Sequence, residues 1–143
     1  MPIVQSMDVP CKLANGTRAS RVFLVEDSKI IRERLLQLLG ALDGVEVVGD
    51  AETAVDAIAG IVAAAPDVVV LDIKLKSGSG IEVLKRIKQS LPSVTVIMLT
   101  NYPMPQLMKK SHQAGADYFF DKCSEFESAI RVIRELTIRR EPA

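Results

Sequence analysis

Five polar residues with chemically useful side chains each stand at the end of a short apolar run. Glu26 and Asp27 follow the run RVFLV, and Asp72 follows VVVL. Thr100 closes the run TVIMLT, and Lys122 follows ADYFFD. Three carboxylates, one hydroxyl and one ammonium are groups that together can bind a divalent cation and the oxygens of a phosphoryl group.

The three carboxylates could share one site only with a cation between them. Like charges repel, and in a partly buried site the pKa of at least one carboxyl group would rise. Oxygen ligands suit a hard ion, and a site that retains water suits Mg²⁺. Asp72 is then the natural nucleophile, because an aspartate can form an aspartyl phosphate. Glu26 and Asp27 would hold Mg²⁺, while Thr100 and Lys122 would each contact a phosphoryl oxygen.

Strand-like and helix-like segments alternate along the chain and would position these residues. Runs rich in β-formers predict strands at residues 21–25, 45–50, 67–72, 93–100 and 116–120. Helical spacing of apolar residues predicts helices at residues 28–42, 53–65, 80–91, 103–115 and 124–140. Five consecutive βα units indicate an α/β fold, a doubly wound parallel sheet with helices on both faces. Ligands bind such sheets at the carboxyl ends of the strands, so the five polar residues should meet at one edge.

Four of these helices carry an apolar stripe that is expected to face the sheet. The expected inward residues are Ile31, Leu35, Leu38, Leu39 and Leu42; Val55, Ile58 and Val62; Ile81, Leu84, Ile87 and Leu91; and Phe126, Ile130, Ile133 and Leu136. Ser28 is a suitable N-cap for the first helix, Pro66 should stop the second, and Gly115 suits the end of the fourth.

Composition bounds the class of protein. The chain has 143 residues, 48% hydrophobic, with a formal net charge of +0, so it can bury a core and carries no basic block that would indicate nucleic acid or a membrane surface. Cys11 and Cys123 form no disulfide or zinc pattern, and no signal peptide is visible, so a cytoplasmic location is expected. Residues 1–19 are expected to form a flexible N-terminal tail and residues 20–140 one domain, without a separate output domain.

The ordered set of strand-end residues resembles the receiver domain of bacterial two-component response regulators, as in single-domain receivers of the chemotaxis-regulator type. The segment GADYFFDK, from Gly115 to Lys122, and Gly80, eight positions after Asp72, fit the same pattern. The resemblance covers about residues 20–140. It implies a flavodoxin-like (βα)5 sheet with strand order 2-1-3-4-5, and a phosphoacceptor in a phosphorelay that is not an enzyme apart from self-catalysed phosphotransfer and autodephosphorylation.

The resemblance also implies how the phosphoryl group is received. Asp72 would accept it from the phosphohistidine of a sensor histidine kinase or a histidine phosphotransfer protein. Glu26, Asp27, Asp72 and the backbone carbonyl of Lys74 would coordinate Mg²⁺.

The signalling role follows from the same resemblance. Thr100 and Lys122 would bind the phosphoryl group, and Thr100 with Phe119 would act as the switch. Their movement would change the face built from the fourth helix, fifth strand and fifth helix. The expected output is an unknown protein target, without nucleic acid or membrane, and the protein is expected to be a monomer or weak dimer.

Four positions depart from the receiver pattern. Lys76 and Cys123 stand where receivers often have proline, so the cis peptide bond expected after Lys122 is in question. Asn101 replaces a commonly small residue, which could narrow access to the acceptor. Phe119 lacks the hydroxyl that a tyrosine would offer.

Two alternatives follow from these departures and from the nucleophile itself. The chain could be a degenerate receiver that acts as a phosphorylation-independent protein-interaction module. It could also be an aspartate-nucleophile phosphatase of small molecules, although that class needs a second acidic residue where this chain has Lys74, and a cap segment. Dinucleotide binding is disfavoured because no glycine fingerprint follows the first strand.

Overall fold

A computed structural model describes residues 19–101 and 104–139 of the chain. Five strands form one parallel sheet, as the sequence predicts: β2 (Ser20–Val25), β3 (Val45–Ala51), β4 (Val68–Leu71), β5 (Thr95–Thr100) and β6 (Tyr118–Asp121). Their spatial order is β3-β2-β4-β5-β6, which is the 2-1-3-4-5 order of the doubly wound flavodoxin-like fold. The predicted tail lies almost wholly outside the described residues.

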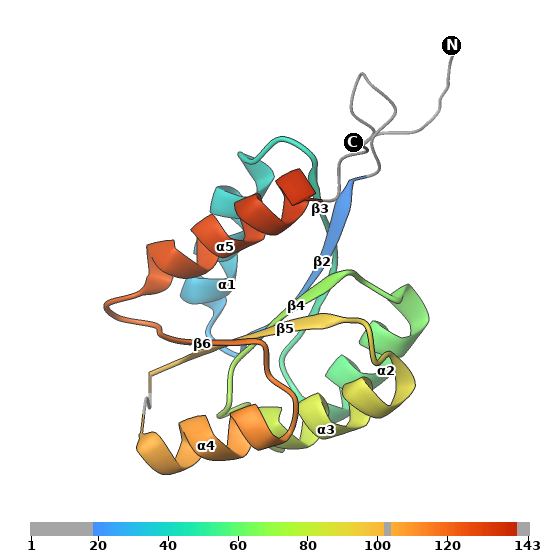
Figure 1. The fold of residues 1–143 in the computed structure, drawn as a ribbon, viewed down its shortest axis with the longest axis vertical. Helices are drawn as coiled ribbons and strands as arrows, with labels where there is room; N and C mark the ends of the chain where they lie inside the picture. Colours follow the sequence, from blue (N-terminus) through green and yellow to red (C-terminus); the bar gives the residue numbers. More distant parts are fainter. Residues whose placement is uncertain (1–18, 102–103, 140–143) are drawn as a thin grey trace.

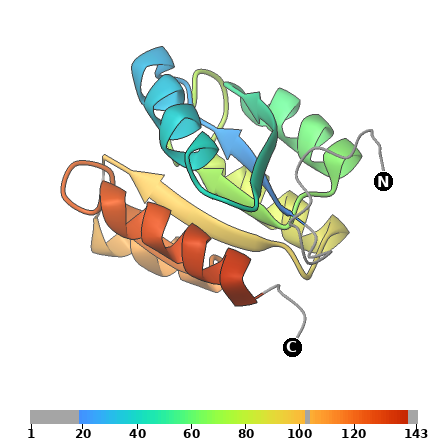
Figure 2. The same cartoon turned by 90° about the horizontal axis from the view of Figure 1, so that it is seen from above.

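Five helices cover the sheet in two layers. They are α1 (Lys29–Gly40), α2 (Ala54–Ala64), α3 (Gly80–Ser90), α4 (Pro105–Gln113) and α5 (Phe126–Arg139). Figures 1 and 2 show α1 and α5 on one face of the sheet and α2, α3 and α4 on the other. Each helix connects two parallel strands or follows the last one, so every strand ends at the same edge of the sheet.

The central strand β4 explains why its run is apolar throughout. All four of its residues are buried, between β2 and β5. Val68 and Val70 pack into the core under α1 and α5, whereas Val69 and Leu71 pack into the core under α2 and α3. Because helices cover both faces of the sheet, the residues that point to either face are apolar. The strand ends at the carboxyl edge, where Asp72 follows it.

Local signals at the helix ends agree with the sequence predictions. The Ser28 hydroxyl accepts a hydrogen bond from the Ile31 N–H and caps α1. Helix α2 ends at Ala64, and its C-cap Ala65 lies in the left-handed region with φ of 48°, directly before Pro66. Gly115 follows α4 with φ of +106°, a conformation that a residue with a Cβ rarely adopts.

The predicted inward face of α2 is wrong. Val55 and Val62 are 76% and 46% exposed, Ile58 is only partly buried, and Ala54, Ala57 and Ile61 are buried instead. The Phe23 ring lies beneath this helix, so close that a Cβ on Gly60 would lie 2.7 Å from it. The helix therefore approaches the sheet through its small residues, and the larger valines turn outward.

The expected stripes of α1, α3 and α5 face the sheet with one exception: in α1, Leu36 and not the predicted Leu38 is among the partly buried residues that pack against the core. Leu35 and Leu39 of α1, Leu84 and Ile87 of α3, and Ile133 of α5 are all fully buried. Their burial fixes each helix against a specific pair of strands, and so sets the positions of the loops at the carboxyl edge. Within the described ranges, no helix has the length and apolar character required to cross a bilayer.

Candidate functional site

Backbone hydrogen bonds place the predicted site residues at one edge of the sheet. The Glu26 N–H donates to the Ala51 carbonyl at 3.0 Å, and the Asp72 N–H donates to the Val25 carbonyl at 3.0 Å. These bonds continue the strand ladders by one residue, so β2 and β4 end side by side. The Lys122 N–H donates to the Thr100 carbonyl at 2.7 Å, which joins the ends of β5 and β6 in the same way.

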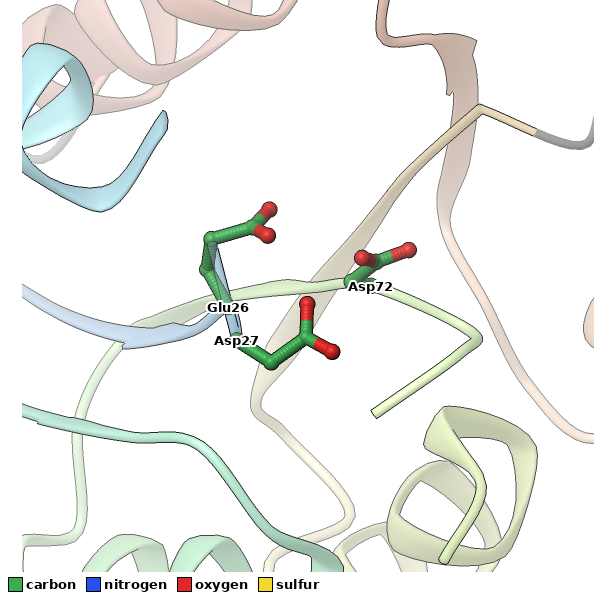
Figure 3. A group of neighbouring side chains, drawn as sticks. All are labelled: Glu26, Asp27 and Asp72. Atoms are coloured by element: carbon green, nitrogen blue, oxygen red, sulfur yellow. The ribbon is translucent and has the colours of Figure 1, made fainter. Parts of the chain in front are cut away.

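Three carboxylates gather at the ends of β2 and β4. Glu26, Asp27 and Asp72 each offer an oxygen, and these oxygens all lie within 4.8 Å of one another (Figure 3). Glu26 and Asp72 are buried, and Asp27 is more exposed. Such a set of hard oxygen donors, open to water on one side, fits a divalent cation that keeps part of its hydration shell.

The Lys122 ammonium is the positive partner of this cluster. Its Nζ lies 2.7 Å from Oε1 of Glu26 and 2.8 Å from Oδ2 of Asp72. The three side chains are 4%, 3% and 7% exposed, respectively. With all four groups ionised, three negative charges and one positive charge leave the site at −2. A divalent cation would balance this charge.

Burial dominates the titration of the two buried carboxyl groups. It raises the pKa of Asp72 above its ordinary value of 3.8, against the hydrogen bond and charge of Lys122. It likewise raises the pKa of Glu26 above 4.5. Burial alone would lower the pKa of Lys122, but its hydrogen bonds to Asp72 and Glu26 outweigh this effect and raise the pKa above 10.5. The ammonium therefore stays charged at neutral pH.

The loop after Asp72 requires glycine at position 80. A Cβ on Gly80 would collide with the Asp72 carbonyl oxygen, which is backbone and cannot move aside cheaply. The Gly80 N–H donates to the Ile73 carbonyl at 2.7 Å, and Ser79 caps α3 through the Ile81 N–H. The loop thus folds back tightly on the acceptor, which is the physical reason for a glycine eight positions after Asp72.

Thr100 and Phe119 occupy neighbouring strands beside the acceptor. Thr100 is fully buried at the end of β5. Phe119 lies in β6 opposite Met98 and is partly buried against the core under α2 and α3. Both are therefore on the strands that connect the carboxyl edge to α4 and α5, and their roles as switch residues remain predictions.

Two of the departures from the receiver pattern contact each other. The Cys123 thiol lies 3.5 Å from Oδ1 of Asn101, which joins the loops after β5 and β6. The Cys123 N–H also donates to Oδ1 of Asp121 at 2.8 Å, a bond that proline could not make. The described residues contain no cis peptide bond, so Lys122–Cys123 is trans.

One arginine beside the site was missed by the sequence reasoning. Arg32, in the first turns of α1, donates from Nη1 to the Glu26 carbonyl at 3.0 Å. A cation four residues inside a helix carries no local signal for this contact. Only the position of α1 against the end of β2 brings it there.

Comparison with known proteins identifies the family. Residues 22–134 match the model described as "Response regulator receiver domain". The chain therefore belongs to the receiver domains of two-component response regulators. These are phosphoacceptor signalling domains and not classical enzymes, and they generally bind Mg²⁺ at an acidic pocket like the one formed by Glu26, Asp27 and Asp72.

Individual relatives agree with this family. The chain is 34% identical over 116 residues to the DNA-binding transcriptional activator DevR/DosR of Mycobacterium tuberculosis, covering 81% of this chain and 54% of that protein. It is 31% identical to the response regulator UvrY of Escherichia coli strain K12, covering 80% of this chain and 53% of that one. The chain thus spans about half the length of the curated relatives it matches.

A solved structure shows the same fold. The CheY-like response regulator receiver domain protein of Methanospirillum hungatei JF-1 superposes with a TM-score of 0.77 at 28% identity, covering 85% of this chain and 96% of that one. The likeness extends over nearly all of that receiver, so the five strands and five helices described above are the family fold.

Proposed function

We propose that Asp72 accepts a phosphoryl group from the phosphohistidine of a sensor histidine kinase or a histidine phosphotransfer protein. The observation that carries the proposal is the buried Asp72 carboxylate, held by Lys122 at 2.8 Å and within 4.8 Å of two further carboxylates. An Asp72 oxygen attacks phosphorus, the phosphorus–nitrogen bond to histidine breaks, and an acyl phosphate forms. The imidazole nitrogen leaves with the electron pair and takes a proton from solvent.

Each neighbouring residue has a part in this transfer. Glu26, Asp27, Asp72 and the backbone carbonyl of Lys74 would hold Mg²⁺. The bound ion would offset the negative charge of the incoming phosphoryl group. Lys122 would keep its contact with the acceptor and pair with one phosphoryl oxygen, and the Thr100 hydroxyl would donate to another.

The signal would leave through the face formed by α4, β6 and α5. Thr100 ends β5, Phe119 lies in the adjacent β6, and these two residues would move together when the phosphoryl group is bound. New charge at a buried site biases an element that has two arrangements, which is the general logic of a phosphorylation switch. Tyr118 and Phe120, whose rings stack at 6.2 Å, flank Phe119 on the same strand.

The proposal extends to partners and location. The domain, residues 20–140, would act through protein contacts with a kinase or phosphotransfer protein and with a downstream protein target, in the cytoplasm, as a monomer or weak dimer. The relatives DevR/DosR and UvrY are longer, and the former is a DNA-binding activator. We assign no nucleic-acid or membrane contact to the receiver domain itself.

Phosphodonor chemistry tests the acceptor directly. Intact mass spectrometry after incubation with acetyl phosphate and Mg²⁺ should show one added phosphoryl group on the natural chain. The Asp72→Asn variant should show none, and the Asp117→Asn variant, which alters an exposed carboxylate at the other end of the sheet, should be modified normally. An unmodified natural chain, together with no amide NMR response to beryllofluoride and Mg²⁺, would contradict the proposal.

The contact between Asn101 and Cys123 favours a second candidate, a phosphorylation-independent interaction module. These two side chains join the loops at the rim of the site and could restrict entry of a phosphodonor. Affinity capture from a lysate distinguishes the candidates when it is repeated with natural chain and Asp72→Asn, each with and without beryllofluoride. A protein captured equally in all four samples supports the constitutive module. A protein captured differently only by the natural chain with beryllofluoride supports the switch.

A further inference from the structure

We propose that Arg32 and Glu52 are positioning residues that brace the loop after Asp72 against the end of β2. This inference rests on the proposed function, because the loop contains Lys74, whose carbonyl is the expected fourth protein ligand of Mg²⁺. Arg32 contacts the backbone carbonyl of Glu26, not its carboxylate. Arg32 and Glu52 act by joining the two backbone segments that carry the ligands.

Arg32 forms the first half of the brace. Its side chain is 15% exposed, so it is largely sheltered from solvent. Nη1 donates to the Glu26 carbonyl at 3.0 Å, Nη2 lies 3.3 Å from Oε2 of Glu52, and Nε lies 3.9 Å from Oδ1 of Asp50. A planar guanidinium can make these contacts in different directions at once, whereas the point charge of a lysine cannot.

Glu52 forms the second half and contacts the loop itself. Its backbone carbonyl accepts from the Lys76 N–H at 3.2 Å, and its Oε1 lies 3.6 Å from the Lys76 ammonium. Two residues further on, the Ala54 N–H donates to the Ser77 carbonyl at 2.8 Å, and Thr53 pairs with Ser77 as a parallel bridge. The loop therefore pairs with the segment after β3 as a short continuation of the sheet.

The backbone contact explains what residue 76 does in this chain. Lys76 stands where receivers often have proline, and its N–H makes a hydrogen bond that proline cannot make. The ammonium of Lys76 adds little, because the side chain is 70% exposed and solvent weakens an exposed ion pair. The loop is thus fixed by the hydrogen bond from the Lys76 N–H to the Glu52 carbonyl. The Glu52 carboxylate is in turn paired with the Arg32 guanidinium.

The remainder of the loop is equally constrained. Ile73 and Leu75 are buried, and a Cβ on Gly78 would lie 2.5 Å from the Ala54 side chain. Lys74 lies between these anchored positions and pairs with Ser79 as an antiparallel bridge. Mg²⁺ requires near-ideal octahedral geometry, so a displaced Lys74 carbonyl would weaken the site even with all three carboxylates intact.

Magnesium affinity of the unphosphorylated protein tests the brace. Calorimetric titration of the natural chain, Arg32→Gln, Glu52→Gln and Lys76→Pro with MgCl₂ should show a Kd raised about 10-fold in each variant, the usual cost of losing a supporting contact. The double variant Arg32→Gln/Glu52→Gln should be little worse than either single one, because both changes break one unit. The matched control is Lys88→Met/Asp117→Asn, which removes an ion pair at the other end of the sheet and should leave the Kd unchanged.

Hydrogen exchange of metal-free protein gives a readout that does not depend on the ion. The Ala54 and Gly80 amides, which donate across and within the loop, should exchange faster in Arg32→Gln and Glu52→Gln than in the control variant. If any variant fails to fold, Arg32→Lys, which keeps the charge but not the forked donor, replaces it in both measurements.

The outcomes separate this inference from the proposed function. If the natural chain binds Mg²⁺ and the variants have the same Kd and loop exchange rates as the control variant, the proposed role of Arg32 and Glu52 is wrong, and the proposed function is unaffected. Variants that lose thermal stability but keep their Mg²⁺ affinity overturn it as well, because Arg32 and Glu52 would then be only structural. Natural chain that neither binds Mg²⁺ nor accepts a phosphoryl group overturns the proposed function and the brace with it.

Discussion

Lys122 and Lys88 make similar ion pairs at opposite ends of the sheet, and their surroundings give those pairs different consequences. At the carboxyl edge, Lys122 lies 2.7 and 2.8 Å from Glu26 and Asp72, and all three side chains are nearly inaccessible. At the amino edge, Lys88 lies 3.0 Å from Asp117, and their side chains are 19% and 41% exposed, respectively. The N–O distances of the two lysine ion pairs are similar, so the difference between the pairs lies in their burial.

The difference shows which end of the sheet is built for chemistry. Water screens and solvates the Lys88–Asp117 pair, so it contributes modestly to stability. At Lys122, removal from water raises the pKa of both partner carboxyl groups and leaves an excess of negative charge. A site that keeps unfavourable charge in a protected place is suited to a ligand that neutralises it.

Replacing each lysine separately should give the largest difference in stability between the two ends of the sheet. Lys122→Met leaves two buried carboxylates without their counter-ion and should lower the free energy of unfolding of metal-free protein by about 3–5 kcal/mol at neutral pH. Lys88→Met should cost about 1 kcal/mol or less. Urea denaturation at pH 7 measures both. Equal losses would mean that burial does not separate the two ends.

Replacing a glycine with alanine should give the next-largest difference in stability between a site at the carboxyl edge and a site away from it. Gly80→Ala forces a Cβ into the Asp72 carbonyl and should destabilise the protein by about 1–3 kcal/mol, as overpacking does. Gly40→Ala, at the end of α1 with nothing within 4 Å of the added Cβ, should stabilise it by about 0.5–1 kcal/mol. Thermal unfolding of both variants measures the opposite signs, and a stabilised Gly80→Ala variant would contradict the tight loop.

The pH dependence of stability should report the carboxyl edge. Asp72 and Glu26 have folded-state pKa values above their ordinary 3.8 and 4.5. At a pH between the ordinary pKa and the raised pKa of each group, the folded state therefore binds more protons than the unfolded state. The free energy of unfolding of metal-free protein should therefore fall as pH rises above about 4 toward the raised pKa values. Denaturation curves in EDTA measure the fall.

Matched variants identify the source of this pH dependence. Asp72→Asn should flatten the fall, and Asp117→Asn should preserve it. Saturating Mg²⁺, which binds the deprotonated carboxylates, should restore stability at the upper end of the pH range. A fall that persists unchanged in Asp72→Asn with EDTA would assign it to other groups.

The effect of salt on the coupling energies of the two ion pairs should be the smallest of these differences. A double-mutant cycle on Lys88 and Asp117 should yield a coupling energy of about 0.2–1 kcal/mol at low ionic strength. The coupling should approach zero in about 1 M NaCl, where the Debye length is about 3 Å. The corresponding cycle on Lys122 and Asp72 should keep most of its coupling energy in the same salt, because solvent ions do not enter a buried pair.

Much of the fold followed from local patterns. Strands read from apolar runs and helices from apolar periodicity agree with the structure to within a few residues, and helix signals at Ser28, Pro66 and Gly115 fall where the helices begin and end. The failure on α2 is instructive. The helix is apolar on nearly every side, so periodicity could not choose a face, and the Phe23 ring on a neighbouring strand made the choice.

The sequence by itself determined the succession of five βα units and the carboxylate, hydroxyl and ammonium groups at their strand ends. It could do so because these properties depend on neighbours along the chain and on one geometric rule of parallel sheets. Only the tertiary structure decided that one ammonium serves both Glu26 and Asp72, that Asn101 meets Cys123, and that Arg32 holds Glu52. Those contacts join segments distant in sequence, and their strength depends on burial, which no single segment specifies.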